Sequence, residues 1–264
     1  MSRAMPFIKS KIKSFEQYGA AELRSIIGPD LYLADSLSAN TLAHTVFLNK
    51  GDSFEAIEFP AEAQFSPAFY CGVSDFDGDG HDDVFISQNF FATQPETPRI
   101  DAGRGLWLRG NGSGNLQAVC GQESGIRIYG EQRGAALSDY NKDGRIDLVV
   151  SQNGARTKLY KNEQAKPGLR VRLQGDNMNI SAVGAIVRLI YPDHSGPARQ
   201  IRTGSGYWSQ DSHVQVFGIP EYPQKIKIIW SGGKSTTSDI PPDAREITVD
   251  NKGEIVSHVN AEVK

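Results

Sequence analysis

The feature that most constrains the fold of this chain is an internal repeat. Residues 71–90, CGVSDFDGDGHDDVFISQNF, align without gaps with residues 135–154, AALSDYNKDGRIDLVVSQNG. Self-similarity at a fixed spacing is typical of repeat architectures. In both copies an aspartate-rich loop precedes an apolar run of β-branched or aromatic residues, VFI or LVV. Such a run predicts a buried strand after each loop.

A second recurring element lies further along each repeat. The segments 46–54, 105–116 and 157–163 each predict a strand with a polar turn around an asparagine. The first of these segments is preceded only by ADSLSANT at 34–41, a degenerate form of the aspartate loop. We therefore predict two well-formed repeat units and one degenerate unit.

The sequence pattern changes on either side of the repeats. After residue 166, the segments LRVRL, AIVRLIY, HVQVF, KIKIIW and REITV alternate apolar residues with polar or basic ones. This is the period of half-buried antiparallel strands, and it predicts a β-sandwich. Ahead of the repeats, residues 14–27 predict one helix, with a capping box at Ser14 and Gln17. The predicted parts are an N-terminal helical segment at 1–30, repeats at 31–166 and a β domain at 167–264.

Both aspartate loops carry the residue types that bind a hard cation. The first loop offers the side chains of Asp75, Asp77, Asp79 and Asp83 and the carbonyl of His81. The second loop offers Asp139, Asn141, Asp143 and Asp147 and the carbonyl of Arg145. Two carboxylates about 4 Å apart repel by about 4 kcal/mol at an effective dielectric of about 20, so a cation among them is favoured. Oxygen ligands select Ca²⁺ or Mg²⁺.

The loops differ from EF-hands and from each other. Ile86 and Val150 stand where an EF-hand needs a bidentate glutamate, and the predicted flanks are strands. The second loop is the weaker candidate, because Asn141 replaces a carboxylate and Lys142 adds a positive charge. Turn formation alone accounts for a single Asp-Gly pair, but not for the same ligand spacing in two loops. Asp82 falls outside the ligand spacing and is expected to face solvent.

The residues of both halves resemble known families. SDFDGDGHDDVFISQN and SDYNKDGRIDLVVSQN resemble the FG-GAP or VCBS repeat, the calcium-binding unit of integrin-type β-propellers. VGAIVRLIY, IRTGSGYWSQDSHVQVFGI and IKIIWSGGKST are similar to the ASPIC/UnbV domain, which follows such repeats in the cartilage acidic protein family. The resemblance implies an all-β fold, with a partial β-propeller of FG-GAP/VCBS blades followed by a small β-sandwich-like domain. It also implies Ca²⁺ at the loop residues named above and an extracellular or periplasmic location.

Closed propellers have about four to eight blades, more than this sequence provides. We therefore expect the chain to be part of a longer propeller, or to pair its open edges with another copy or with its own helix. No run of apolar residues is long enough to span a membrane, and the N-terminus lacks the apolar region of a signal peptide. The net charge of −3 argues against nucleic-acid binding. The histidines show no paired spacing typical of zinc sites.

The leading functional hypothesis is a non-catalytic, calcium-stabilised binding or adhesion module that contacts an extracellular protein or a glycan. The alternative is a carbohydrate-active enzyme or its accessory domain, which would need two free carboxylates about 5–9.5 Å apart. The obvious carboxylates here are predicted metal ligands instead. A third hypothesis is a structural appendage that caps a longer propeller.

Outside the loops, the cysteines and two of the tryptophans also carry expectations. Cys71 and Cys120 predict two buried free thiols, with a single disulfide as the alternative. Trp230 is expected in the core, and Trp208 is left open between the core and a recognition surface.

Overall fold

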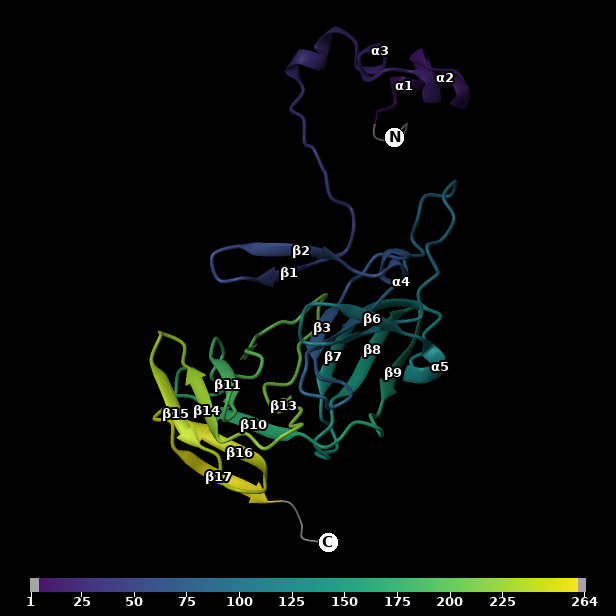
Figure 1. Ribbon diagram of the computed structural model, residues 1–264. Coiled ribbons are helices and arrows are strands. Elements are labelled where there is room, and N and C mark those ends of the chain that lie inside the picture. Colours follow the sequence, from purple (N-terminus) through teal and green to yellow (C-terminus); the bar gives the residue numbers. More distant parts are fainter. Residues whose placement is uncertain (1–4, 261–264) are drawn as a thin grey trace. The chain divides into compact units, whose positions relative to one another are not determined.

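The computed structural model describes residues 5–260 and shows an all-β protein with a few short helices (Figure 1). It divides into a unit that ends at Leu42 and a unit that begins at Ala43. Among the described residues, no sheet closes into a barrel. None of the described helices has the length and apolar character needed to cross a membrane.

The N-terminal unit is helical, but the helix predicted over residues 14–27 is divided. It consists of α2 (Phe15–Ala20) and α3 (Leu23–Ile27), between α1 (Ile8–Lys11) and the 3-10 helix η1 (Pro29–Leu33). Ser14 caps α2 as predicted, because its side chain accepts a hydrogen bond from the Gln17 backbone N–H at 3.1 Å. The step from Tyr18 to Leu23 is too long to keep both side chains on one helical face, and Gly19 weakens the helix before the break.

The repeats form antiparallel sheets whose strands follow chain order. The first is a hairpin of β1 (Thr45–Asn49) and β2 (Phe54–Glu58). The second contains β3 (Cys71–Ser74), β4 (Asp83–Ile86), β5 (Leu106–Gly110) and β6 (Leu116–Val119), and the third contains β7 (Glu131–Ser138), β8 (Asp147–Asn153) and β9 (Ala155–Tyr160). Short helices α4 (Ala61–Gln64) and α5 (Gly121–Ser124) lie in the connections. Each aspartate loop joins two paired strands, β3 to β4 and β7 to β8, as the repeat predicted.

The C-terminal region is a sandwich of two four-stranded sheets. One has the order β13-β10-β16-β17 and the other β12-β11-β14-β15. The strand bounds are β10 (Leu169–Gln174), β11 (Ile186–Ile190), β12 (Arg199–Gln200), β13 (Gln215–Phe217), β14 (Lys225–Ile229), β15 (Ser235–Asp239), β16 (Ala244–Asp250) and β17 (Ile255–Asn260). The pairing of β10 with β16 is parallel, whereas the alternating pattern predicted antiparallel strands. The remaining pairs in both sheets are antiparallel.

The inner faces of the two sheets share one hydrophobic core. Val171 and Ile247 from one sheet and Val187 and Ile228 from the other are fully buried in the same cluster. Full burial of each such side chain contributes about 1.5–3 kcal/mol to folding. Trp230 belongs to this core, as predicted, and its indole N–H donates to Thr236 Oγ1 at 2.9 Å.

The structure shows whether Trp208 and the two cysteines are buried or exposed. Trp208 is 94 % exposed, so it lies on the surface. Cys71 and Cys120 are both free, as predicted. Both are exposed, however, so the expectation that they would be buried was wrong.

The repeats and the sandwich pack against each other within the second unit. Val216 of β13 belongs to the core cluster that Leu137 and Leu148 form in the third repeat sheet. The fully buried Tyr70 donates its hydroxyl hydrogen bond to Asp211 Oδ1 at 2.6 Å. Asp211 also accepts the backbone N–H of Leu137 at 2.9 Å. The repeats and the sandwich therefore share buried apolar and hydrogen-bonded contacts where they meet.

A buried ion pair fixes the long connection after β4. Glu131 on β7 accepts the Phe91 backbone N–H at 2.6 Å and the Asn153 amide at 2.8 Å, and it lies 2.7 Å from Arg133. Burial alone would raise the pKa of Glu131. The hydrogen bonds and the guanidinium outweigh burial and hold the pKa below its ordinary value.

Replacing Glu131 tests this anchor. Glu131→Gln is expected to lower the free energy of unfolding by about 2 kcal/mol near neutral pH, because a buried charged hydrogen-bond acceptor is lost. A carboxyl whose pKa is lower in the folded than in the unfolded protein stabilises the fold at a pH above its unfolded pKa. This stabilisation is lost as the pH falls through the folded pKa. Urea unfolding should therefore show a smaller difference from wild type at about pH 3.

The exposed Glu163, which pairs with Lys161, supplies a control. Glu163→Gln should change the unfolding free energy by less than about 0.5 kcal/mol. A Glu131→Gln effect that is equal at both pH values would contradict a role for the ionised carboxylate.

Candidate metal centre

The first aspartate loop, which we call loop one (residues 75–83), is folded around two buried carboxylates. Asp75 accepts backbone hydrogen bonds from Gly78 at 2.6 Å and from Gly80 at 2.8 Å. Asp83 accepts the Phe76 N–H at 2.9 Å and the Gly110 N–H at 2.7 Å. Gly80 has φ 91°, which favours glycine at this position of the turn. The two side chains thus hold both ends of the loop.

The structure brings three predicted ligands of loop one together. Carboxylate oxygens of Asp75, Asp77 and Asp83 lie within 4.8 Å of one another. Within the described residues, Asp77 Oδ1 is buried without a hydrogen-bond partner. Asp79 lies outside this cluster, and its Oδ1 accepts the His81 N–H at 2.8 Å. A buried acceptor that lacks a donor, beside two further carboxylates, fits a hard divalent cation.

Burial disfavours the ionised forms of the two carboxylates at the ends of loop one. Burial raises the pKa of Asp83 to about 7, against the effect of the hydrogen bonds from Gly110 and Phe76. Burial likewise raises the pKa of Asp75. A raised carboxyl pKa means that the environment disfavours the ionised form. A cation bound among these groups would remove that cost.

Two arginines border loop one, and one of them contacts a carboxylate of the cluster. Arg109 Nε lies 2.9 Å from Asp77 Oδ2. Arg199, which is almost entirely buried, lies 2.8 Å from Asp82 Oδ1 and also donates to Ser74 Oγ and the Val216 carbonyl. Asp82 is therefore an ion-pair partner of the C-terminal sandwich, and the expectation that it faces solvent was wrong.

The second aspartate loop, which we call loop two (residues 139–147), has the same backbone scaffold. Asp139 accepts the Asp143 N–H at 3.0 Å and the Gly144 N–H at 2.8 Å. Asp147 accepts the Tyr140 N–H at 3.2 Å and the Asn162 N–H at 2.8 Å. The sequence repeat is thus a repeat of hydrogen bonds, with carboxylates at both ends of each loop.

Carboxylate oxygens of loop two are engaged by nitrogen groups. Arg170 of β10 binds Asp139 Oδ2. Arg145 lies 3.1 Å from Asp143 Oδ2, and the Asn141 amide donates to the same oxygen at 2.9 Å. In the part of the chain that the structure describes, loop two contains no cluster of three converging carboxylates. The side chain of Arg145 thus takes part in loop two, whereas the sequence predicted a role for its carbonyl.

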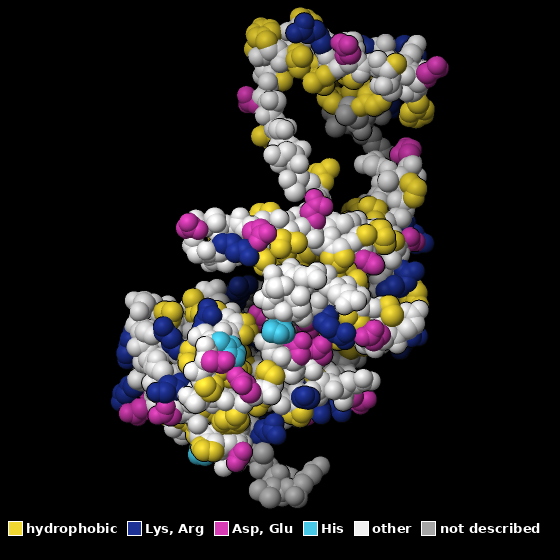
Figure 2. All heavy atoms as spheres, viewed as in Figure 1, with side chains coloured by type: hydrophobic (Ala, Val, Ile, Leu, Met, Phe, Trp, Pro, Cys, Tyr) yellow, Lys and Arg dark blue, Asp and Glu magenta, His cyan; other side chains and the backbone are white. Residues whose placement is uncertain are grey.

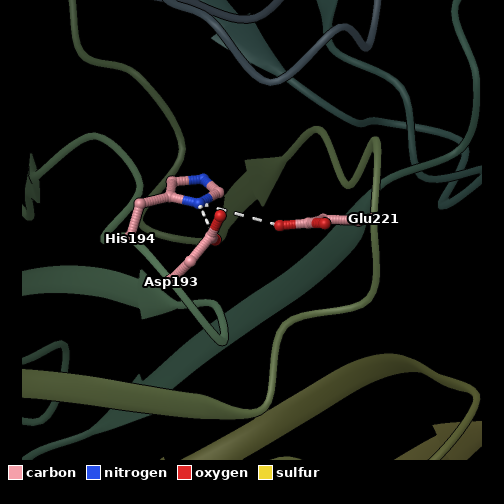
Figure 3. A group of neighbouring side chains, drawn as sticks. All are labelled: Asp193, His194 and Glu221. Atoms are coloured by element: carbon pink, nitrogen blue, oxygen red, sulfur yellow. Dashed lines mark hydrogen bonds and ion pairs between the residues drawn. The ribbon is translucent and has the colours of Figure 1, made fainter.

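A third acidic group lies on the surface of the sandwich. His194 Nδ1 is 2.7 Å from Asp193 Oδ1 and 3.7 Å from Glu221 Oε1, as Figure 3 shows. The hydrogen bond with His194 lowers the pKa of Asp193. Sequence reasoning missed this group, because Glu221 comes from a distant segment. The ring nitrogen of His194, which can donate a hydrogen bond to a carboxylate, accounts for this grouping.

The two larger cavities beside loop one have different linings. A cavity of about 580 Å³ is lined by Asp77, Trp107, Arg109 and Tyr160, among others. A larger one, of about 990 Å³, lies between loop one and the sandwich, with His81 and Tyr191 among its lining residues. Figure 2 shows histidine and acidic side chains close together on the face below the β1–β2 hairpin. The candidate metal centre therefore borders space that a ligand could occupy.

Comparison with protein families agrees with this arrangement. Residues 75–150 match the model of the FG-GAP-like repeat, and residues 175–255 match the model named ASPIC and UnbV. A search of curated proteins gave no match to the chain. The first match spans both aspartate loops, and the second covers most of the sandwich. The chain thus contains an FG-GAP-like repeat region that is followed by an ASPIC and UnbV domain.

Proposed function

We propose that the chain is a calcium-binding, non-catalytic binding module in which Ca²⁺ at loop one stiffens the joint between the repeats and the sandwich. The observation that carries this proposal is the convergence of Asp75, Asp77 and Asp83, with Asp77 Oδ1 buried and unpartnered in the described structure. Asp79 and the carbonyl of His81 are the further ligands that the sequence predicts. Bound Ca²⁺ would supply positive charge to these oxygens.

The contacts of loop one support an effect on the joint. A Cβ added to Gly80 would lie 2.8 Å from the ring of Pro220, and one added to Gly218 would lie only 1.7 Å from Asp75 Oδ2. The sandwich backbone therefore packs directly against the carboxylate that begins the loop. Ordering of loop one by an ion would also order this contact.

The module would bind its partner beside the joint. The larger cavity, about 990 Å³, lies at the upper end of the size range of ligand sites, about 300–1,000 Å³. An extracellular protein or a glycan is the partner that the family resemblance implies. The same resemblance supports an extracellular or periplasmic location, where calcium modules with affinities of about 10⁻⁴–10⁻³ M are found.

The alternative of a carbohydrate-active enzyme receives less support. Asp77 and Glu123 both line the smaller cavity, next to Trp107. Arg109 lies 2.9 Å from Asp77 and 3.1 Å from Glu123, so both carboxylates share one guanidinium. General acid catalysis on a glycoside needs a carboxylic acid that holds its proton. Both carboxylates are engaged by one arginine instead of lying free in the cavity, which supports a binding role.

Thermal unfolding tests calcium binding at loop one. Ca²⁺ added to chelator-treated protein at about 100 times its Kd should stabilise the fold by about 2.7 kcal/mol. This corresponds to a rise in Tm of about 5–10 °C for a unit of this size. Asp77→Asn should abolish most of the rise, because it removes the unpartnered carboxylate.

The control is Asp52→Asn in the exposed turn of the β1–β2 hairpin, which also removes one negative charge. This variant should keep the full response to Ca²⁺. An unchanged Tm for wild type, or an equal loss in both variants, would refute a specific site at loop one.

The contact of Gly218 with Asp75 gives a second prediction. Gly218→Ala should displace the Asp75 carboxylate, because no Cβ fits 1.7 Å from its oxygen. Overpacking of this kind costs about 1–3 kcal/mol of stability. Calcium affinity, measured by isothermal titration calorimetry, should fall at least about tenfold, which is a loss of about 1.4 kcal/mol.

Gly19→Ala is the matched control, because nothing lies within 4 Å of the added Cβ. Its calcium affinity should equal that of wild type. Wild-type affinity in Gly218→Ala would show that the position of Asp75 against the sandwich has no bearing on the ion.

A further inference from the structure

We propose that loop two is not a metal site but an ionic joint, in which the guanidinium of Arg170 takes the place of a cation and fastens the repeats to the C-terminal sandwich. The proposal differs from the sequence prediction, which assigned Asp139, Asn141, Asp143, Arg145 and Asp147 as ligands of a second ion. It also stands independently of calcium binding at loop one.

The position of Arg170 carries the inference. Arg170 lies on β10, the first strand of the sandwich, and its side chain is only 6 % exposed. Its terminal nitrogen binds Asp139 Oδ2, and the same nitrogen lies 3.4 Å from the Asp139 carbonyl oxygen. The Asp139 side chain is 1 % exposed, so this contact is shielded from water. The side-chain carboxylate and the backbone carbonyl of Asp139 are therefore both directed at the guanidinium of Arg170.

A second carboxylate holds Arg170 in this position. Its Nε donates to Glu246 Oε2 at 2.8 Å. Glu246 lies on β16 and is the partner of Arg170 in the parallel ladder between β10 and β16. The parallel pairing that the sequence pattern did not predict thus places the anchor beside the arginine. The result is a chain of charges from loop two into the sandwich.

The two loops differ most clearly at the first carboxylate. Asp75 of loop one accepts only backbone N–H groups in the described structure, from Gly78, Asp79 and Gly80. Asp139 accepts backbone N–H groups at two of the equivalent positions, those of Asp143 and Gly144, and binds Arg170 in addition. Arginine stays protonated in proteins, so its charge is permanent. A divalent ion on Asp139 would stand beside this buried positive charge and be repelled.

Loop two also contains its own compensating groups. Arg145 pairs with Asp143 from within the loop, and the Asn141 amide donates to the same carboxylate. Asn141, which made loop two the weaker candidate for a metal site, is therefore one of the residues that compensate for the charge of the loop from within. The same repeat scaffold serves one loop whose first carboxylate, Asp75, accepts only backbone N–H groups and one loop whose first carboxylate, Asp139, also binds a buried arginine.

Calcium stoichiometry measured by equilibrium dialysis tests the proposal on the full chain. Wild type is expected to bind one Ca²⁺, and Asp147→Asn in loop two should leave that number unchanged. Asp77→Asn in loop one should reduce it to none. A wild-type value of two, or a loss of one ion in Asp147→Asn, would overturn the proposal.

Removal of the guanidinium gives the converse test. Arg170→Met keeps most of the apolar side chain but exposes the loop-two carboxylates to an added ion, so it should bind two Ca²⁺. Without Ca²⁺ its Tm should fall, and added Ca²⁺ should restore part of the loss. The control is Arg172→Met on the same strand, where the side chain is exposed, and it should bind one Ca²⁺ with an unchanged Tm.

A second variant, Asp139→Asn, tests the ionic joint even if Arg170→Met does not fold. Asp139→Asn should lower the Tm by the same amount with and without Ca²⁺, while leaving the stoichiometry at one. If wild type binds no Ca²⁺ but Asp139→Asn still lowers the Tm, the proposed function fails and the ionic joint stands. A Tm of Asp139→Asn equal to that of wild type would overturn the joint.

Discussion

The structure depends on buried carboxylates that accept backbone N–H groups in the two aspartate loops. Asp75 and Asp139 close the tight turns, while Asp83 and Asp147 tie the same loops to the chain beyond the next strand. A buried N–H that loses its acceptor costs about 1–3 kcal/mol, so each loop needs these aspartates whatever else they bind. These aspartates bring buried negative charge into each loop, and the surroundings of the loop must compensate for that charge.

The compensation explains why the loops lie at the boundary with the sandwich. Arg199 reaches Asp82 beside loop one, and Arg170 reaches Asp139 in loop two, both from strands of the sandwich. Buried ion pairs of this kind contribute little net stability over apolar groups of similar size, but breaking one costs several kcal/mol. They therefore fix how the repeats and the sandwich are oriented. Their role is specificity of the joint, and the hydrophobic cores on each side supply the stability.

Most of the local structure was predictable, because it depends on sequence patterns that span a few residues. The repeat predicted loops between paired strands, and the alternation after residue 166 predicted the sandwich and the burial of Trp230. The contacts that decide the chemistry were not predictable in this way. Arg170 and Asp139 are far apart in the sequence, and nothing in the spacing of either segment indicates the other. The parallel β10–β16 pairing and the ion pair of Asp82 were missed for the same reason.

The sandwich also supplies part of the packing that a neighbouring blade provides in a closed propeller. Val216 of the sandwich completes the cluster of Phe85 and Leu148, which come from two different repeat sheets. The sheets therefore bury apolar surface against the following domain as well as against each other. Since Arg199 also donates to the Val216 carbonyl, the ion pair at loop one and this hydrophobic contact act on the same strand. The ion pair at loop one and the hydrophobic core of the repeats are thus connected through β13.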